Sequence, residues 1–388
     1  MKIRNANTVP DLIIVGAGLV GLTIAERVAN VLGKCVQIYE HRNHIGGNAY
    51  SFKDPETGVE VHKYGTHIFH TSNNLVFNYV SQFMTLNSYR HRVFSQHKGQ
   101  LFDFPINKNT LNSFFNINLQ ESEVDSFLDS LRINPEHGHN PKNLEEKALQ
   151  LVGRDLYEAF IKGYTSKQWQ EDLRKLPASI ISRIPVRSDT NIDYFDDKYQ
   201  GVPRDGYGSW FDKMIDNDNI DIQLNTDFFE VKSGIDPSIP VVYTGPIDRY
   251  FDYRYGLLGW RTLDFEVSTK DVDSFQDAAV INYPDLSEPF TRIHEFKKLH
   301  PEITYEESKS IIMYEYSRAA NVSDAPYYPM NRDVDREMLA KYRENVKSEK
   351  DVFFVGRLAT YAYLDMDMAI ASALNVFENK IKPRLETS

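Results

Sequence analysis

The beginning of the chain alternates short apolar runs with one helical stretch. Leu12–Val15 is an apolar run typical of a buried strand, a helical pattern covers residues 22–32, and a second apolar run covers residues 35–39. Strand patterns return at residues 221–245 and 352–355. Because strands that alternate with helices form parallel sheets, we predict a Rossmann-type sheet assembled from separated segments.

The middle of the chain carries two other patterns. Residues 75–175 read as mostly helical, and Asn143 is a candidate N-cap for an amphipathic stretch that follows it. Residues 261–266, 278–283 and 309–317 alternate or run apolar like antiparallel strands. We therefore predict an α/β protein whose Rossmann-type domain receives a helical insertion and an antiparallel β-sheet insertion.

The predicted domains are discontinuous in sequence. The dinucleotide-binding domain is expected to combine residues 1–85, 215–250 and 345–388. The helical domain is expected at residues 100–175. The sheet domain, which would carry the substrate, is expected to combine residues 176–214 and 251–344, with a mobile loop near 175–187.

The first turn carries a glycine pattern with a phosphate-binding mechanism. Gly16 permits a tight turn, Gly18 lets the backbone approach a pyrophosphate, and Gly21 lets the helix pack close to the strand. Glu40 ends the second strand, about 20 residues further on, where an acid can accept hydrogen bonds from ribose hydroxyls. This pattern predicts a bound dinucleotide.

Two later elements favour FAD over NAD as that dinucleotide. A second glycine pair, Gly46 and Gly47, closely follows Glu40, and the strand at 352–355 ends on Gly356 and Arg357 before another helix. In flavoproteins with this kind of domain, such elements support the pyrophosphate and the flavin ring.

Composition narrows the class of protein. The chain has 388 residues and a net charge of −11, which argues against a general attraction to nucleic acid or to an anionic membrane. Its single cysteine, Cys35, excludes disulfides and is expected to be a buried thiol. No segment is long and apolar enough to suggest membrane insertion, so we expect a cytoplasmic enzyme.

Several blocks along residues 10–380 resemble the bacterial UDP-galactopyranose mutases. The matching blocks are, in order, His44–Tyr50, Tyr64–Thr71, Gly163–Trp169, Arg183–Arg187, Tyr194–Phe195, Tyr199–Gly201, Thr291–Ile293, Tyr327–Pro329, Gly356–Leu358 and Tyr361–Asp367. Two places depart from the family pattern. Thr66 stands where the family usually has proline, and residues 294–298, after Arg292, match less closely.

The resemblance implies an FAD enzyme that interconverts UDP-galactopyranose and UDP-galactofuranose without net redox change. The flavin must be reduced, its N5 attacks the anomeric carbon as UDP leaves, and the sugar recloses through its other hydroxyl. It also implies a homodimer and a supply of electrons from NAD(P)H or a reduced flavin.

The resemblance assigns catalytic roles to Arg183, Arg292 and His67. The two guanidinium groups would grip the diphosphate, because a planar fork binds phosphate oxygens in a way that lysine cannot copy, although most arginines only form surface ion pairs. His67 would approach the flavin. The expected substrate-binding residues are Phe160, Tyr164, Thr165, Trp169, Arg183, Tyr194, Phe195, Asn282, Arg292, Tyr328 and Tyr363.

The expected cofactor-binding residues combine the glycine motif with positions taken from the resemblance. They are Gly16, Gly18, Gly21, Glu40, Arg42, Gly47, Asn48, His67, Gly356, Arg357, Asp365 and Met366. His67 and His70 have the spacing of a metal pair, but nothing nearby in sequence supplies further ligands, so no metal is expected. Asp365 could instead simply cap the last helix.

Two other functions remain open from the sequence. A flavin-dependent oxidoreductase of the amine-oxidase type could share the fold, because fold alone does not decide function. A non-catalytic FAD-binding scaffold would bind FAD tightly and show no response to UDP.

Overall fold

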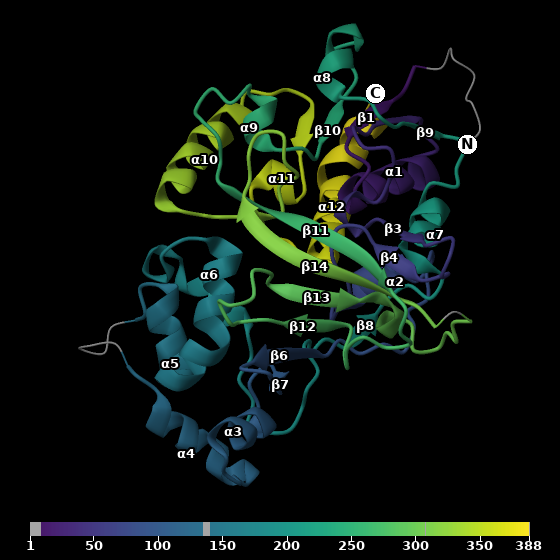
Figure 1. The fold of residues 1–388 in the computed structure, drawn as a ribbon. Helices are drawn as coiled ribbons and strands as arrows, with labels where there is room; N and C mark the ends of the chain where they lie inside the picture. The colour runs from purple at the N-terminus through teal and green to yellow at the C-terminus, as the bar shows by residue number, and fades with distance from the viewer. Residues whose placement is uncertain (1–8, 135–139, 307, 388) are drawn as a thin grey trace.

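A computed structural model describes residues 9–134, 140–306 and 308–387, and for Ser182 and Arg183 it describes the backbone only. Two large sheets organise the fold. Figure 1 shows the parallel sheet and its helices in the upper half, with a larger mixed sheet and a helical insertion below. The α/β class predicted from the sequence is confirmed.

The parallel sheet has the strand order β16–β10–β1–β2–β9. All its pairings are parallel, and Ile14 in the central strand lies opposite Ile38 on one side and Val242 on the other. The strands come from three distant parts of the chain, as predicted: β1 (Leu12–Val15), β2 (Val36–Tyr39), β9 (Ile220–Gln223), β10 (Val241–Tyr243) and β16 (Val352–Phe354).

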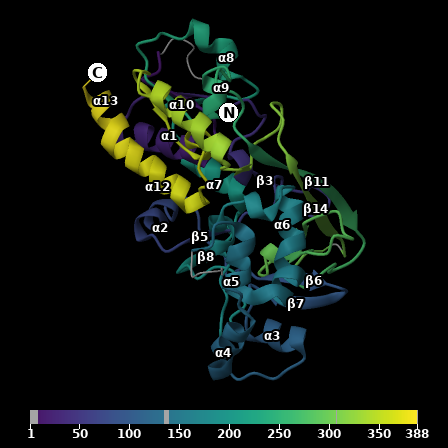
Figure 2. The ribbon, with the colours of Figure 1, turned by 90° about the vertical axis from the view of Figure 1, so that its left-hand side faces the viewer.

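Helices cover the parallel sheet and bury its apolar face. Helix α1 (Leu19–Leu32) packs against α12 (Met366–Val376), which continues through the π-helical residues Phe377–Ile381 into α13 (Lys382–Glu386). Figure 2 shows α12 and α13 as one long rod beside α1. Cys35 lies just before β2 and is half-buried, so the prediction of a buried thiol is wrong.

The larger sheet has the order β15–β11–β14–β13–β12–β6–β7. Its neighbours pair in antiparallel fashion, as predicted, except that β12 and β6 run parallel. The strands are β6 (Val93–His97), β7 (Gln100–Phe104), β11 (Trp260–Lys270), β12 (Val280–Asn282), β13 (Arg292–Glu295), β14 (Ser310–Ala319) and β15 (Tyr328–Pro329).

The first two of these strands correct the helical prediction for residues 75–175. Strands β6 and β7 form a hairpin joined by Lys98 and Gly99, which both have positive φ, at 50° and 79°. That geometry fits a two-residue turn whose twist matches the flanking strands. The polar residues within the hairpin hid its strand pattern.

The helical insertion follows the hairpin. It consists of α3 (Lys108–Phe115), α4 (Glu121–Leu131), α5 (Leu144–Leu156), the π-helical residues Tyr157–Lys162 and α6 (Gly163–Trp169). Asn143 caps α5 as predicted, since its side chain accepts a hydrogen bond from the Glu146 N–H at 2.9 Å.

The remaining strands and helices lie outside the two large sheets and the helical insertion. Among them are two small antiparallel pairs, β3–β4 and β5–β8. The bounds of the remaining strands and helices are β3 (Ser51–Lys53), β4 (Glu60–His62), β5 (Phe69–Thr71), β8 (Tyr199–Gly201), α2 (Asn74–Val80), α7 (Gly206–Met214), α8 (Phe228–Val231), α9 (Ile247–Tyr250), α10 (Asp333–Val346) and α11 (Arg357–Thr360). Within the described ranges, no helix combines the length and the apolar character needed to cross a membrane.

Two helices suggest a change to the predicted domain boundaries. Helix α7, predicted to belong to the substrate domain, packs on β3 and α1, and Trp210 joins the apolar core of the parallel sheet. Helix α10 places Leu339 and Tyr342 in a cluster with residues of α9. Because the packing of apolar faces decides where a helix belongs, we propose that both helices are part of the dinucleotide-binding domain.

Candidate active site

The glycine turn between β1 and α1 is built for a close backbone approach. Gly16 has φ +99°, and a Cβ on Gly21 would lie 2.0 Å from the Gly16 carbonyl oxygen, so neither position accepts a side chain. Helix α1 begins directly after Gly18, with no side-chain cap and no acid in its first turn. Its N-terminal N–H groups are therefore not capped by a side chain and could bind an anion.

The second glycine pair faces this turn. The Gly46 N–H donates to the Ala17 carbonyl at 2.8 Å, and a Cβ on Gly47 would lie 3.0 Å from the Gly18 Cα. The structure thus brings together Gly16, Gly18, Gly21 and Gly47, and their role as a pyrophosphate cradle stays a prediction.

Glu40 ties the second strand to the glycine turn. Its carboxylate accepts the Ala17 N–H at 2.8 Å and the Arg42 N–H at 2.8 Å, and it is buried. Burial by itself raises the pKa of Glu40, but the bonds from His41, Arg42 and Ala17 outweigh burial and lower it. An ionised carboxylate has about four acceptor sites, so one stays available for a further donor, and the predicted role of Glu40 at the ribose stays a prediction.

Arg42 supplies an unused donor beside the cradle. Its guanidinium lies 4.4 Å above the centre of the Tyr64 ring, and Nη2 donates to the Asn48 Oδ1 at 2.9 Å. The Arg42 Nη1 is buried and has no hydrogen-bond partner among the described residues. A buried unpaired donor beside an open helix N-terminus fits a negatively charged dinucleotide such as FAD.

Strand β16 of the parallel sheet leads into Gly356 and Arg357, two further residues predicted to bind the cofactor. Gly356 has φ +94°, and Arg357 donates to the Tyr327 carbonyl at 3.2 Å and to the Leu364 carbonyl. Asp365 is the N-cap residue of α12, although its side chain makes no capping bond to that helix.

A cavity of about 700 Å³ opens next to this cradle, between α6 and the mixed sheet. Its wall includes every predicted substrate residue whose side chain the structure describes: Phe160, Tyr164, Thr165, Trp169, Tyr194, Phe195, Asn282, Arg292, Tyr328 and Tyr363. The predicted cofactor residues Asn48, His67, Arg357, Asp365 and Met366 line it too.

One row of side chains crosses the sheet beneath the cavity. Asn282, Arg292 and Glu315 are direct neighbours on β12, β13 and β14 and therefore share one face. The Arg292 Nε donates to the Tyr164 hydroxyl at 2.7 Å and lies 3.6 Å from the Glu315 Oε1. The Asn282 Oδ1 is buried without a hydrogen-bond partner in the described structure. A ligand in the cavity would therefore meet the guanidinium of Arg292, held by Tyr164 and Glu315, and the unpaired amide oxygen of Asn282.

Glu315 was missed by the sequence analysis. Burial raises the pKa of its carboxyl, but the charge of Arg292, the contact with His294 and the hydrogen bond from Thr291 outweigh burial and hold the pKa at about 2. The sequence did contain a signal, because Glu315 is an acid within a strand that begins with the apolar run Ile311–Met313. Its partner Arg292 can be identified only from the register between the strands.

Phenols surround Arg292 and stay protonated. Burial raises the pKa of Tyr164 and of Tyr328 well above the usual value for a phenol. The Tyr328 and Tyr363 rings stack with centroids 5.8 Å apart and planes inclined by 12°. Their hydroxyls can therefore donate hydrogen bonds to phosphate oxygens without adding charge.

The two histidines of the Tyr64–Thr71 block have different surroundings. The His67 Nδ1 lies 2.8 Å from the Gly65 carbonyl, and burial lowers the pKa of His67 to about 4, so the ring is neutral. The His70 Nδ1 lies 2.7 Å from the Asp197 Oδ2, and the ring stacks on Phe195 at 3.7 Å. Across the described ranges, no group of His, Cys, Asp and Glu is arranged to hold a metal ion.

The loop predicted to carry Arg183 borders the cavity. Residues Ala178–Arg183 form a 3₁₀ turn, and Ser179, Ile180, Ile181 and Ile184 line the cavity wall. The side chain of Arg183 lies outside the described part of the structure, so its role stays a prediction.

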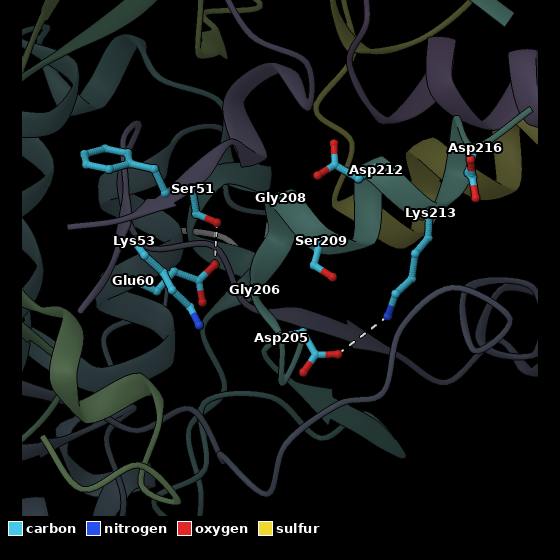
Figure 3. Close-up of a pocket in the computed structure, with 11 residues that line it drawn as sticks. Ser51, Lys53, Glu60, Asp205, Gly206, Gly208, Ser209, Asp212, Lys213 and Asp216 are labelled. Atoms are coloured by element: carbon cyan, nitrogen blue, oxygen red, sulfur yellow. Dashed lines mark hydrogen bonds and ion pairs between the residues drawn. The ribbon is translucent and has the colours of Figure 1, made fainter. Parts of the chain in front are cut away.

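A second hollow, of about 510 Å³, lies between β3 and α7 (Figure 3). Glu60, Asp205, Asp212 and Asp216 line it and outnumber its two lysines, Lys53 and Lys213. The Glu60 carboxylate is already held by Ser51, the Tyr207 N–H and His300. This acidic surface would repel a diphosphate, so the larger cavity is the candidate active site.

The fold and the site together define a Rossmann-type flavoprotein with a cationic, phenol-lined cavity beside its glycine turns. Comparisons with known proteins make this specific. Residues 159–363 match the family model described as UDP-galactopyranose mutase, and residues 14–83 match that of the NAD(P)-binding Rossmann-like domain. The chain belongs to the UDP-galactopyranose mutase family, so it is an isomerase and its cofactor is FAD.

Individual relatives agree with this assignment. The chain is 43% identical to a Klebsiella pneumoniae protein named "Probable UDP-galactopyranose mutase", over 94% of this chain and 93% of that one. It is 38% identical to the dTDP-fucopyranose mutase of Escherichia coli, over 97% and 99%. A crystal structure of reduced UDP-galactopyranose mutase has the same fold, with a TM-score of 0.72 at 16% identity over 97% of this chain and 94% of that one. The alternative of an amine-oxidase-type oxidoreductase is not favoured.

Proposed function

We propose that this enzyme interconverts UDP-galactopyranose and UDP-galactofuranose in the large cavity, with reduced FAD bound along the adjoining glycine turns. The observation that carries the proposal is the setting of Arg292. A guanidinium fixed by Glu315 and Tyr164 faces a cavity beside a dinucleotide cradle. An ionic group held this firmly is organised in advance for a charged leaving group.

The diphosphate is recognised by Arg292 together with Tyr328 and Tyr363. Departure of UDP places negative charge on the phosphate oxygens, which a guanidinium and phenolic donors stabilise more strongly than they stabilise the intact substrate. Arg183 is the second clamp in this proposal, on the strength of its place beside the cavity and its match to the family.

The base and the sugar are held by the aromatic part of the wall. The Tyr194 ring packs edge-on against Phe195 at 5.0 Å, and both line the cavity. Phe160 is buried among Phe102 and Phe114, so it forms a rigid wall rather than a mobile contact. We assign these rings to uracil and Trp169 to the galactose.

Reduced FAD, when bound, supplies a nucleophilic nitrogen for the anomeric carbon. The chain supplies position and charge. His67 is neutral and its Nδ1 is turned to the Gly65 carbonyl, which leaves Nε2 as an acceptor at the cavity wall. We propose that this acceptor orients the cofactor.

The test is isomerisation by the purified flavoprotein. UDP-galactofuranose incubated with dithionite-reduced enzyme should convert to UDP-galactopyranose through many turnovers per reduction, with no stoichiometric loss of reductant. Air-oxidised enzyme is the control and should be nearly inactive. Equal rates for the two forms, or no conversion by either, would disprove the proposal.

The 38% identity to a dTDP-fucopyranose mutase supports a second candidate substrate. The same reduced enzyme should therefore be given dTDP-fucopyranose in parallel, and kcat/KM compared. A higher kcat/KM for the dTDP sugar would reassign the substrate without changing the class of reaction.

We propose further that the enzyme is a cytoplasmic homodimer that accepts electrons from NAD(P)H or a reduced flavin. The family resemblance supports these properties. Light scattering after gel filtration tests the dimer, and anaerobic bleaching of the flavin by NADPH tests the reductant.

A further inference from the structure

The two places where the sequence departs from the family pattern contact each other. Thr66 lies in the loop between β4 and β5, and His294 lies on β13, two residues beyond Arg292. The Thr66 Oγ1 is 2.8 Å from the His294 Nδ1. A residue on the cavity wall is thus linked to the strand that carries Arg292.

The other nitrogen of His294 continues the contact. The His294 Nε2 lies 3.3 Å from the Glu315 Oε2 without a hydrogen bond between them, so the two groups interact through their charges, and both side chains are about 1% exposed. The other oxygen of Glu315 accepts the Thr291 hydroxyl at 3.0 Å and lies 3.6 Å from the Arg292 Nε. Thr66, His294, Glu315 and Arg292 therefore form one continuous series of polar contacts.

The Thr66 hydroxyl is the hydrogen-bond partner of the His294 Nδ1, on the side of the ring away from Glu315. The pKa of Glu315 is about 2, so its carboxylate can only accept, and it favours a proton on the His294 Nε2. The His294 Nδ1 on the other side of the ring faces the Thr66 hydroxyl, which can donate a hydrogen bond to it or accept one from it. Removing this hydroxyl leaves a buried ring nitrogen unpaired, and the imidazole loses the contact that orients it.

We propose that Thr66 is a positioning residue for Arg292 and acts through His294 and Glu315. The inference rests on the proposed role of Arg292 at the diphosphate. Since Tyr164 also holds the Arg292 Nε, the loss of Thr66 loosens the guanidinium rather than releasing it.

The test uses Thr66→Val, which keeps the shape and removes the hydroxyl, and Thr66→Ser, which keeps the hydroxyl. UDP affinity of the FAD-loaded protein is measured by calorimetry, with melting temperature and flavin content as controls for folding. Thr66→Val should weaken UDP binding by about 2- to 30-fold, the range reported for residues that act through a network. Thr66→Ser should restore the affinity. Unchanged affinity in Thr66→Val would overturn the proposal.

A coupled pair of variants separates positioning from direct contact. In an Arg292→Met background, Thr66→Val should have no further effect on UDP affinity. An equal loss with and without Arg292 would show that Thr66 acts elsewhere, and the proposal would fail. If Arg292→Met itself binds UDP like the parent, the proposed role of Arg292 fails instead.

A second variant, His294→Gln, changes the same series of contacts and tests the proposal if Thr66→Val does not fold. His294→Gln keeps an N–H near the Nε2 position and loses the contact with Thr66. It should weaken UDP binding as Thr66→Val does, and the two changes together should cost no more than one. His294→Gln with parental UDP affinity would overturn the proposal.

Discussion

Arg292 and Glu315 stand opposite each other across two antiparallel strands, with the Arg292 Nε 3.6 Å from the Glu315 Oε1. The pairing explains how a cation is kept in one position at the wall of a cavity. It also means that the two residues act as a unit, because removing Arg292 leaves the buried Glu315 carboxylate without its partner.

Arg292→Lys should lower turnover by on the order of 10²-fold, because an ammonium keeps the charge but loses the planar fork. Folding and flavin content should be retained. Arg318→Lys on the neighbouring strand is a matched control, since Arg318 is more than one-third exposed and pairs with Asp264 and Asp324 away from the cavity. Steady-state kinetics of the reduced enzyme provide the measurement, and similar rates for the two variants would contradict the role of Arg292.

Arg183→Ala should also reduce turnover by on the order of 10²-fold, with flavin content unchanged, if its side chain reaches the departing diphosphate. Arg183→Lys should recover only part of the rate. Arg174→Ala is the control, because Arg174 lies nearby in sequence, is mostly exposed and pairs with Asp172. Parental turnover and UDP affinity in Arg183→Ala would show that Arg183 is a surface residue without a role at the diphosphate.

Gly18→Val should abolish FAD binding, because a branched side chain would fill the space between the glycine turn and the second glycine pair. The protein should be purified colourless. Gly234→Val is the control, since no atom lies within 4 Å of a Cβ at Gly234. The measurement is the flavin absorbance per mole of protein. A yellow Gly18→Val protein would contradict the prediction that the glycine turn binds FAD.

Lys167→Met should loosen the loop between Asn282 and Arg292. The Lys167 Nζ lies 2.5–2.9 Å from the backbone carbonyls of Tyr283, Asp285, Glu288 and Phe290. An ammonium has three N–H donors to share among these carbonyls, and a hydrogen bond to a charged group is worth about 1.5–3 kcal/mol. The melting temperature should fall and KM should rise, whereas Lys162→Met, which removes an exposed lysine paired with Glu158, should change neither. A parental KM in Lys167→Met would show that the loop does not position the site.

Acid should destabilise the protein from about pH 6.5 downward. Burial lowers the pKa of His62 to about 3, of His67 to about 4 and of His91 to about 3. Unfolded histidines titrate near 6.5, so between pH 6.5 and 4 the unfolded chain binds more protons, and stability falls with falling pH by up to about 1.4 kcal/mol per pH unit for each ring.

Urea unfolding at pH 6.5, 5.5 and 4.5 measures this slope. The pKa of His300 is raised by its carboxylate partners against the effect of burial, so its contribution changes above pH 6.5 and not in this window. His91→Gln should make the free energy of unfolding depend less steeply on pH, by the contribution of one of the three histidines. A free energy of unfolding that does not change between pH 6.5 and 4.5 would contradict the prediction.

Local sequence determined the dinucleotide-binding half of the protein. The glycine spacing at Gly16, Gly18 and Gly21 is a consequence of backbone geometry over a few residues, so its structure could be read directly. The blocks shared with the family likewise marked the cavity residues in advance, and the structure places all those with described side chains around one cavity. The β6–β7 hairpin escaped prediction because polar residues interrupt its alternation.

Only the tertiary structure decided what holds the site in place. Glu315 meets Arg292 through strand register, and Thr66 meets His294 across 228 positions of sequence. Helix α7 packs Trp210 into the apolar core of the parallel sheet, and helix α10 packs Leu339 and Tyr342 into a cluster with Ile247 of α9. Such pairings depend on which segments pack together, and no local pattern of hydrophobic and polar residues specifies them. The sequence by itself determined the chemistry available to this protein, while long-range packing decided how its reactive groups are oriented.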